Sequence, residues 1–405
     1  MEKNIRRFYW YRLTKFSLFH IAILVLFYQE RGLSFSQIMI LQSVYYFAKV
    51  LSEVPTGAWA DRVGRKKSLI FGSFFHSFAY LLIFFSHSLI PFILGEIIAG
   101  ISMSFAYGAD SALAYDTLKN LGREEEYQRV EGNANSMRHL GFALFAPIGG
   151  LLATINLALP YLASSIGIFI SGLIAFTFVE PQKDKSVQSS KFKVQRKAYH
   201  EMKISWNLII NNKRILWFVL FFSLIFLATR LGFWTYQPYM KQVGLPLSLF
   251  GVVLAFFHLF SALVSKYADK LERFLREKLM LFIMPALVVV SFVLLSRFLF
   301  LWSISFILIL QVTTAMHEPV LKSYLNRVTP SEVRATMLSV QNMVGNAAFA
   351  IFAPFLGSLV DRFHIENALL IFALVIIIFS SLLWRYRIRW FKPTRILLKP
   401  NREKT

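Results

Sequence analysis

The sequence contains no cysteine, so neither disulfide bonds nor thiol chemistry are available to it. Charged residues are also scarce: they make up 16% of the 405 residues, against about 25% in a typical soluble chain. Hydrophobic residues reach 56%, and phenylalanine alone occurs 42 times. A soluble fold could not bury so much apolar surface without exposing patches that aggregate. The composition therefore argues against a soluble protein.

Charge is missing altogether from several long stretches. No Asp, Glu, Lys or Arg occurs between Arg138 and Glu180, a run of 41 residues, which is enough for two bilayer crossings of about 20 residues each. Segments in hydrocarbon must satisfy their own backbone hydrogen bonds, so these stretches are expected to be helices. Similar charge-free gaps lie at 68–95, 242–265, 279–296, 298–317 and 335–360.

The apolar stretches predict an all-α membrane protein with twelve transmembrane helices in two pseudo-symmetric six-helix bundles. The first bundle is expected at 1–180 and the second at 213–388. The cytoplasmic linker between them, 181–212, is polar and rich in Lys and Ser, as a flexible connection is. A basic cytoplasmic tail follows at 389–405. The twelve spans are expected at 8–28, 36–60, 68–89, 91–118, 127–154, 158–180, 213–240, 245–269, 277–297, 299–326, 332–360 and 366–388.

The distribution of Lys and Arg predicts the orientation of these spans. Of the 44 such residues, 37 fall on the side that holds both termini and the linker, including Arg12 and Lys15 at the start of the first span. Both termini are therefore expected in the cytoplasm, with the chain in the inner or plasma membrane. The net charge of +22 could suggest nucleic acid binding, but basic residues gathered in short loops serve instead as topology signals. The opposite side holds Arg31, Lys241, Arg297 and Arg362.

The two halves repeat at an offset of 207 residues. Phe142–Gly150 reads FALFAPIGG and matches FAIFAPFLG at Phe349–Gly357. The same offset pairs Asn135 with Asn342 and maps the first, fourth and sixth spans onto the seventh, tenth and twelfth. Two parallel repeats predict a substrate site near the membrane midplane, between the halves.

The loop after the second span carries a dense motif. Residues 57–67 read GAWADRVGRKK, which resembles the signature loop of the major facilitator superfamily between its second and third spans. In that family the loop is a cytoplasmic latch that stabilises the outward-facing state, and the resemblance implies that Arg65 pairs with Asp116 at the end of span 4. The implied latch comprises Gly57, Asp61, Arg62, Gly64, Arg65, Lys66, Lys67 and Asp116. The alternative interpretation is that these charges only fix the topology.

Physical properties of the loop residues agree with such a role. Gly57 permits close helix approach, Gly64 permits a tight turn, and Asp61 can cap a facing helix N-terminus. The second-half copy at 265–270 reads SKYADK. It retains an Asp and a basic neighbour but has lost both glycines, so it does not by itself predict a second latch.

Span 5 carries a second resemblance, to the glycine-rich motif of drug–proton antiporters in this superfamily. Gly132, Gly141, Gly149 and Gly150 fall at the spacing of the motif, whereas Pro147 lies one position late. Small residues and a proline allow a membrane helix to pack closely and to kink. The resemblance implies export, and ordinary helix packing explains the same residues equally well.

Ionisable residues inside the spans are candidates for the transport site, because each costs at least about 2.5 kcal/mol at mid-bilayer. In span 4, Glu96, Tyr107 and Asp110 are expected on one face, with Glu96 near the outer interface. Asp110 serves either as a coupling or substrate residue or as an ion-pair partner that locks helices. In span 10, Glu318 is expected at a related depth, so that the two carboxyls bind and release protons. His317 either tunes that step or makes a simple hydrogen bond to a neighbour.

Three basic residues lie inside spans. Arg138 of span 5 is expected either to neutralise Asp110 or to bind an anionic substrate, because a guanidinium stays charged and fits carboxylates. Arg230 of span 7 is expected in the outer half of the cavity. Lys49 and Glu53 of span 2 are four residues apart and are expected to neutralise each other.

The sequence shows no cluster with the spacing of a metal site and no glycine-rich nucleotide loop followed by Lys-Ser/Thr. It also shows no hydrolase or kinase constellation. No metal, no cofactor and no enzymatic activity are therefore expected. The expected partners are a small-molecule substrate, protons and the lipid bilayer, and the family resemblance implies a monomer.

Together these features predict a secondary transporter that moves a small solute by alternating access. Proton-coupled efflux of a drug or metabolite is the leading interpretation. Import of a small anionic or polar nutrient, bound by Arg138 and Arg230, is the alternative. A non-transporting membrane receptor is a third interpretation, because a fold alone does not determine function.

Overall fold

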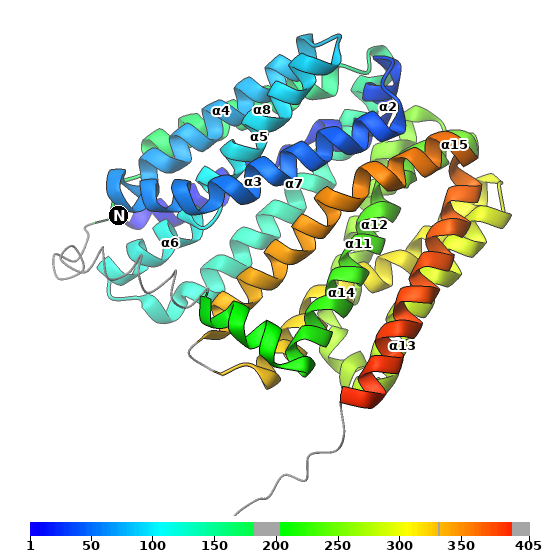
Figure 1. Ribbon diagram of the computed structural model, residues 1–405. Coiled ribbons are helices and arrows are strands. Elements are labelled where there is room, and N and C mark those ends of the chain that lie inside the picture. Colours follow the sequence, from blue (N-terminus) through cyan, green and yellow to red (C-terminus); the bar gives the residue numbers. More distant parts are fainter. Residues whose placement is uncertain (182–202, 331–332, 391–405) are drawn as a thin grey trace, which may run out of the picture.

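The computed structural model describes residues 1–181, 203–330 and 333–390, and every regular element within these ranges is a helix. Figure 1 shows two layers of long helices, one coloured blue to teal and one green to red. The first half consists of α1 (Glu2–Lys15), η1 (Phe19–Ala22), α2 (Leu24–Glu30), α3 (Phe35–Val63), α4 (Arg65–Phe85), α5 (Leu89–Ala106), α6 (Ala109–Asn120), η2 (Glu124–Glu126), α7 (Tyr127–Ile155) and α8 (Leu159–Thr177). The second half consists of α11 (Lys213–Gln242), α12 (Leu247–Lys266), α13 (Ala268–Arg297), η3 (Leu301–Phe306), α14 (Ile307–Val328) and α15 (Arg334–Trp390).

The helices account for the expected spans. Nine helical segments of the described chain are long and apolar enough to cross a membrane, or up to 10 with the bent pair Glu2–Ala22 and Leu24–Glu30. One of the nine, Thr336–Arg387, is 52 residues long and contains two of the expected spans. The remaining span is α3, whose polar residues keep its mean hydropathy low. The prediction of an all-α membrane protein with two six-helix bundles is confirmed.

The first and fourth spans are broken, although the sequence was expected to give continuous helices there. The first span bends by 49° between η1 and α2. The fourth span is interrupted between α5 and α6, where Gly108 adopts a φ of +79°. A left-handed backbone of this kind suits glycine, which has no Cβ. Because of this break, Tyr107 and Asp110 do not lie on one helical face, which corrects the expectation from their spacing.

The last two spans are joined without a loop. They were expected as separate helices at 332–360 and 366–388, but both belong to α15, which is 57 residues long. The chain reverses its direction sharply at His364, whose φ of 60° and ψ of 167° are not helical. Figure 1 shows the two limbs of α15 meeting at this corner, in orange and red.

Part of the expected linker is folded. Residues 203–211 are helical, and Ile209 is 2% exposed in an apolar cluster that includes Trp217 and Met280. This segment therefore packs against the second half and is not the flexible connection that its composition predicted. Residues 182–202 of the linker and 391–405 of the tail lie outside the described residues.

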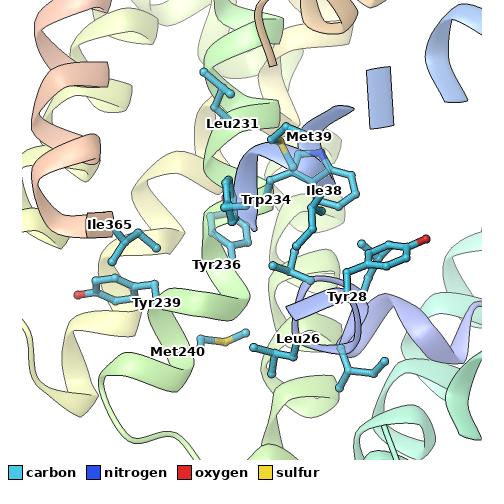
Figure 2. Packing of buried hydrophobic residues seen from close by; sticks show 14 of the residues in the cluster. Leu26, Tyr28, Ile38, Met39, Leu231, Trp234, Tyr236, Tyr239, Met240 and Ile365 are labelled. Carbon is cyan, nitrogen blue, oxygen red and sulfur yellow. The ribbon is translucent and has the colours of Figure 1, made fainter. Parts of the chain in front are cut away.

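One apolar cluster extends across both halves. Figure 2 shows Tyr28, Ile38 and Met39 of the first half beside Leu231, Trp234 and Tyr236 of the second. Met39 is 0% exposed and Trp234 is 5% exposed, so this part of the interface excludes water. The halves are therefore packed tightly at the end of the molecule that contains α2 and the start of α3, which the distribution of Lys and Arg places outside the cell.

Candidate functional site

A glutamine from the second half completes the broken first span. Gln237 Oε1 accepts a hydrogen bond from the Val25 N–H at 2.7 Å, and Gln237 Nε2 donates to the Ile21 carbonyl at 2.8 Å. Both backbone groups lie at the break between η1 and α2, where the helical hydrogen-bond pattern is interrupted. A buried backbone group without a partner is costly, so α11 and the first span stabilise each other.

A second contact between the halves is made by an aspartate of α15 that caps the N-terminus of α3. The N–H groups of Phe35 and Ser36, at the start of α3, donate to the two carboxylate oxygens of Asp361 at 2.8 Å each. A helix N-terminus has unpaired N–H groups and a partial positive charge, so a carboxylate is favoured there. Asp361, directly after the eleventh span in α15, thus caps the helix of the second span, α3.

These four hydrogen bonds join the halves in the described parts of the chain, and all lie toward the extracellular ends of the helices. Near the midplane the halves meet through rings: Tyr46 and Phe349 have centroids 5.1 Å apart, and Phe142 and His258 have centroids 5.2 Å apart. The halves are therefore closed against each other on the extracellular side.

Further toward the cytoplasm, charged side chains of the two halves face one another. Lys49 of α3 is within electrostatic reach of Arg230 of α11, and Arg138 of α7 is within reach of Glu318 of α14. Tyr107 is 55% exposed at the break between α5 and α6. The predicted cavity residues thus come from both halves and from the helices expected to line a central site.

The basic residues of this region lack acidic partners at contact distance. Among the described residues, Arg138 makes no salt bridge or hydrogen bond, although its Nε is buried. Its guanidinium lies 5.6 Å from the centroid of the Phe16 ring, and that of Arg230 lies 5.1 Å from the Phe226 ring. Such cations can bind an anionic group that enters the space between the halves.

The expected pair of Lys49 and Glu53 is within electrostatic reach but not in contact. No salt bridge joins these two side chains in the described structure, and the Lys49 ammonium lies 5.3 Å from the centroid of the Tyr107 ring. The four-residue spacing brings the side chains to one side of α3, but the Lys-before-Glu order is the less favourable one. The break in the fourth span offers Lys49 an aromatic face instead.

Asp110 is buried in an ion-pair cluster, and its partner is Arg12. Arg12 Nε lies 3.0 Å from Asp110 Oδ2, and Arg12 Nη2 lies 3.0 Å from Glu131 Oε1. Ser111 joins the cluster by donating to Glu131 at 3.1 Å and accepting from Arg12 at 2.9 Å. The contact partner of Asp110 is therefore Arg12 and not Arg138, which corrects the first of the two expectations for Arg138 and leaves the second, binding of an anionic substrate, as a prediction. The cluster ties together α1, α6 and α7.

Arg12 and Lys15 are functional candidates that the sequence reasoning missed, because it treated them as topology signals. Arg12 is 6% exposed and Lys15 is 3% exposed. The Lys15 ammonium donates to the Gly72 carbonyl at 2.9 Å. The polar residue Asn4, 1% exposed, shows that α1 is buried from its first turn. A helical plot that began the first span at residue 2 would have placed these side chains inside the bundle.

The carboxyls of the two halves are in unlike surroundings. The side chain of Glu318 is 70% exposed and pairs with Lys322, one turn along α14, at 2.6 Å. His317 forms a hydrogen bond from Nε2 to the Phe222 carbonyl at 2.9 Å, as expected for a histidine that faces a neighbouring helix.

Glu96 was expected near the outer interface but is only 6% exposed. In the described residues, no three His, Asp or Glu side chains converge as metal ligands would.

The signature loop forms the contact that its resemblance implied. Arg65 Nε lies 2.8 Å from Asp116 Oδ2, and Gly64 adopts a φ of +118° between α3 and α4. The backbone N–H groups of Arg65 and Lys66 donate to the Glu180 carboxylate at 2.7 and 2.8 Å. The helix capped at this loop is therefore α4, and Glu180 caps it.

The other loop residues lie at the surface. Gly57 was expected to permit close helix approach, but a Cβ added there would meet nothing within 4 Å. This correction follows from its position on the exposed side of α3. Asp61, Arg62 and Lys67 are exposed as well, and Lys66 is partly buried.

The second half has an ion pair near the place that corresponds to Arg65 and Asp116, with an acidic residue in the place of Arg65. Glu272 stands 207 positions after Arg65, is 8% exposed, and accepts hydrogen bonds from Ser323 at 3.1 Å and Arg327 at 2.7 Å. Ser323 in turn stands 207 positions after Asp116. The repeat offset would have located Glu272 and Ser323, although the loop motif itself is lost, but not Arg327, which corresponds to Asn120. The side chain of Asp269 lies outside the described residues.

The glycines of span 5 permit close contacts on two sides of α7. A Cβ at Gly149 would lie 1.9 Å from the Phe19 carbonyl oxygen, and one at Gly141 would lie 3.0 Å from that of Leu13. Gly150 faces Gly251 of α12 in the second half. A Cβ added at Gly251 would lie 1.9 Å from the Ala146 carbonyl oxygen. Pro147 is part of this second contact, whereas Gly132 has open space around it.

Comparison with known proteins gives the context of this geometry. The sequence profile of the Major Facilitator Superfamily matches residues 12–353. The chain is 25% identical over 366 residues to an uncharacterised MFS-type transporter, YxaM, of Bacillus subtilis, covering 88% of both chains. It is 24% identical over 326 residues to the class H tetracycline resistance protein of Pasteurella multocida, covering 78% of both.

Solved structures show the same fold. A point mutant of the nucleoside transporter NupG superimposes with a TM-score of 0.80 over 96% of this chain and 100% of that one. The two sequences are 14% identical, so this similarity concerns the arrangement of helices alone.

Proposed function

The chain belongs to the Major Facilitator Superfamily, and from this membership we propose that it exports a small organic solute in exchange for protons. The transport would proceed by alternating access, in which the two halves rock around a site near the midplane. The solute would bind between the halves, among Lys49, Tyr107, Arg138, Arg230 and Glu318.

The observation that carries this proposal is the one-sided closure of the halves. Gln237 and Asp361 join them on the extracellular side. Toward the cytoplasm, Tyr107 and Glu318 are more than half exposed. An arrangement closed at one end and accessible at the other is what alternating access requires of an inward-facing state.

Proton coupling is proposed for Asp110, with Glu318 as the carboxyl of the other half. Asp110 is held by Arg12, which also binds Glu131. If Asp110 takes up a proton, its attraction to Arg12 is lost and the guanidinium keeps only one carboxylate. The contacts between α1, α6 and α7 then change with the protonation state, as a coupling site requires.

The latch is proposed to work at the cytoplasmic end. Arg65 and Asp116 join the start of α4 to the end of α6, and Glu180 fixes the N-terminus of α4. This keeps the loop in one conformation while the halves move.

The direction of transport is proposed on two grounds. One relative is a tetracycline resistance protein, and span 5 carries glycines that resemble an antiporter motif and contact both the first span and α12.

The test is counterflow in proteoliposomes with an imposed pH gradient. We expect candidate solutes to accumulate against their own gradient in the acidic compartment, because the protons that leave this compartment drive solute into it. The Asp110→Asn variant should exchange solute but ignore the pH gradient. Transport that does not respond to the gradient in the unmodified protein would exclude proton coupling.

A second candidate function, import of a small organic anion, is favoured by the cations of the cavity. Lys49, Arg138 and Arg230 have no acidic partner at contact distance in the described structure. Cells that contain the protein would then take up a labelled anion faster, whereas an exporter lowers the accumulation of its substrate. An Arg138→Gln variant should raise KM for anions by about tenfold or more, since one charge-assisted hydrogen bond is lost.

A further inference from the structure

A carboxyl group without a charged partner is buried in the first half. Glu96 of α5 is 6% exposed. Its Oε1 accepts hydrogen bonds from the Tyr28 hydroxyl at 2.7 Å and from the Gln42 amide at 3.2 Å. Among the described residues, no Lys or Arg forms a salt bridge with it. Glu96 therefore differs from Asp110, whose charge is balanced by Arg12.

The groups in direct reach of Glu96 are uncharged, and the charge of Arg230 on α11 reaches one of them, Tyr45. They come from every element packed around it: Tyr28 from α2, Gln42 and Tyr45 from α3, Tyr80 from α4, and Tyr161 from α8. Behind Tyr80 and Tyr161, the His20 ring packs at centroid distances of 4.5 and 4.6 Å. An isolated carboxylate in such surroundings costs far more free energy than the neutral acid. Both donors meet at Oε1, which leaves Oε2 to carry a proton.

The hydrogen-bond partners of Glu96 belong to the elements that close the extracellular side. Tyr28 is on α2, which is joined to Gln237 through Val25. Gln42 is on α3, whose first N–H groups are held by Asp361. A change of charge at Glu96 would therefore act directly on both contacts between the halves.

We propose that Glu96 is a proton-binding site of the first half and that its bound proton stabilises the closed extracellular side. With the proton in place, Tyr28 and Gln42 satisfy the neutral carboxyl. When the proton is released, the carboxylate requires water, which it obtains when α2 and α3 move away from the second half. The proton is exchanged with that water. The proposal rests on alternating access, to which it adds the carboxyl that links extracellular protons to closure.

The test measures the distance between the halves as the pH changes. Because the chain has no cysteine, two spin labels can be placed at Glu30→Cys on α2 and Lys241→Cys on α11, both exposed positions. We expect alkaline buffer to lengthen this distance, with the ratio of closed to open molecules falling by about tenfold per pH unit where one proton is released. In Glu96→Gln, a neutral isostere, the distance should stay short at every pH. A Glu96→Gln response identical to that of the parent would overturn the proposal.

Two further measurements keep the outcome clear. Glu366→Gln removes an exposed carboxyl at the same end of the molecule, where it accepts a hydrogen bond from Gln242 at 3.1 Å, and it should leave the pH response intact. If Glu366→Gln abolishes the response and Glu96→Gln does not, the assignment to Glu96 is wrong.

Infrared difference spectra should show a protonated-carboxyl band that is absent from Glu96→Gln. Solute counterflow in the same vesicles tests transport separately, so that a failure of the transporter proposal is distinguishable from a failure at Glu96.

Discussion

Arg12 is the residue that balances the charges of Asp110 and Glu131 in the first half. It contacts Asp110 and Glu131, each at 3.0 Å, and its side chain is 7% exposed. A buried ion pair adds little net stability compared with an apolar pair, because both charges must lose their water. Removal of one partner alone strongly destabilises the fold, since it leaves the other charge buried and unpaired.

Arg12→Ala is therefore expected to lower the free energy of unfolding by about 3 to 5 kcal/mol. The double variant Arg12→Ala with Asp110→Asn should recover part of that loss, because Asp110→Asn removes a carboxylate charge that Arg12→Ala leaves buried and unpaired. Denaturant unfolding in detergent, followed as a double-mutant cycle, measures the difference. The control is Arg129→Ala, whose side chain is 70% exposed beside Glu126 and whose loss should cost no more than about 1 kcal/mol. Equal losses for Arg12 and Arg129 would contradict the buried cluster.

At the residue scale, the sequence identified the charged residues inside the spans better than it identified the residues that contact them. It identified Asp110, Arg138 and Glu318 as membrane-embedded charges, and Arg65 with Asp116 as a pair through the family resemblance. It could not identify Arg12 as the partner of Asp110, because the two are 98 positions apart and the pairing depends on how α1 and α6 pack. The proximity of Tyr28 and Gln42 to Glu96 depends on three-dimensional packing in the same way.

At the scale of elements, α3 and α15 form one of the two long contacts between the halves. Asp361 at the end of one limb caps the first turn of the other helix, and Gly357 lies against Ser36, with its Cβ position 2.7 Å from the Ser36 Cα. The same close approach recurs between α7 and α12 at Gly150 and Gly251. Both contacts use the smallest residue where two backbones meet.

Asp361→Asn should open the extracellular side. The amide removes the negative charge at the α3 N-terminus, an effect of about 1 kcal/mol, which would change the ratio of closed to open molecules by roughly fivefold. A reporter at Ser36 or Gln37 is unsuitable because both residues belong to the start of α3, where Gln37 accepts a hydrogen bond from the Ser34 N–H. The distance between spin labels at Glu30→Cys and Lys241→Cys therefore gives the readout. A longer distance in Asp361→Asn than in Glu366→Gln is the expected result, and equal distances would show that the cap does not control closure.

Gly251→Ala should prevent the closed state, because the added methyl group would lie 1.9 Å from the Ala146 carbonyl oxygen. We expect transport to fall by about fivefold or more, since the backbones must separate to relieve an overlap that costs about 1 kcal/mol or more. Gly132→Ala is the matched control: it lies on the partner helix α7 and has open space within 4 Å. It should retain transport, and a similar loss in both variants would argue against a packing effect.

Breaks in helices were the part of the elements that the sequence did not predict. Hydropathy counts apolar residues over a window and is insensitive to one turn of irregular backbone. The interruption at Gly108 becomes visible only because its φ is positive, and that at His364 because the helix turns without a loop. Spans without such breaks, such as α4 and α8, were predicted within a few residues of their observed ends.

At the scale of the whole molecule, the structure is accessible from one side. This can be tested with single cysteines in a chain that has none of its own. Tyr107→Cys, at a position 55% exposed, should react with a maleimide supplied from the cytoplasmic side and not from outside. Lys241→Cys should show the opposite preference. Ser164→Cys, at a position 0% exposed, should react from neither side, and labelling of Tyr107→Cys from outside alone would reverse the assignment of the closed end.

The global architecture was predictable because it depends on physics that a sequence records directly. The length of apolar runs determines the number of crossings, and the placement of Lys and Arg determines orientation. The internal repeat at offset 207 indicates two similar halves. Which conformational state the halves adopt depends on small differences between competing contacts, and these are not recorded in any run of residues.

The salt bridges seen in the described residues are all contained within one half or the other. Arg65 pairs with Asp116, whereas its counterpart Glu272 pairs with Arg327, four residues beyond the counterpart of Asp116. Each half therefore balances its charges through ion pairs of its own. A substitution of a paired residue in one half removes no salt-bridge partner from the other, and the contacts at Gln237, Asp361 and Gly251 still join the halves. Residues on the surface between the halves can consequently change without breaking a salt bridge that stabilises either half.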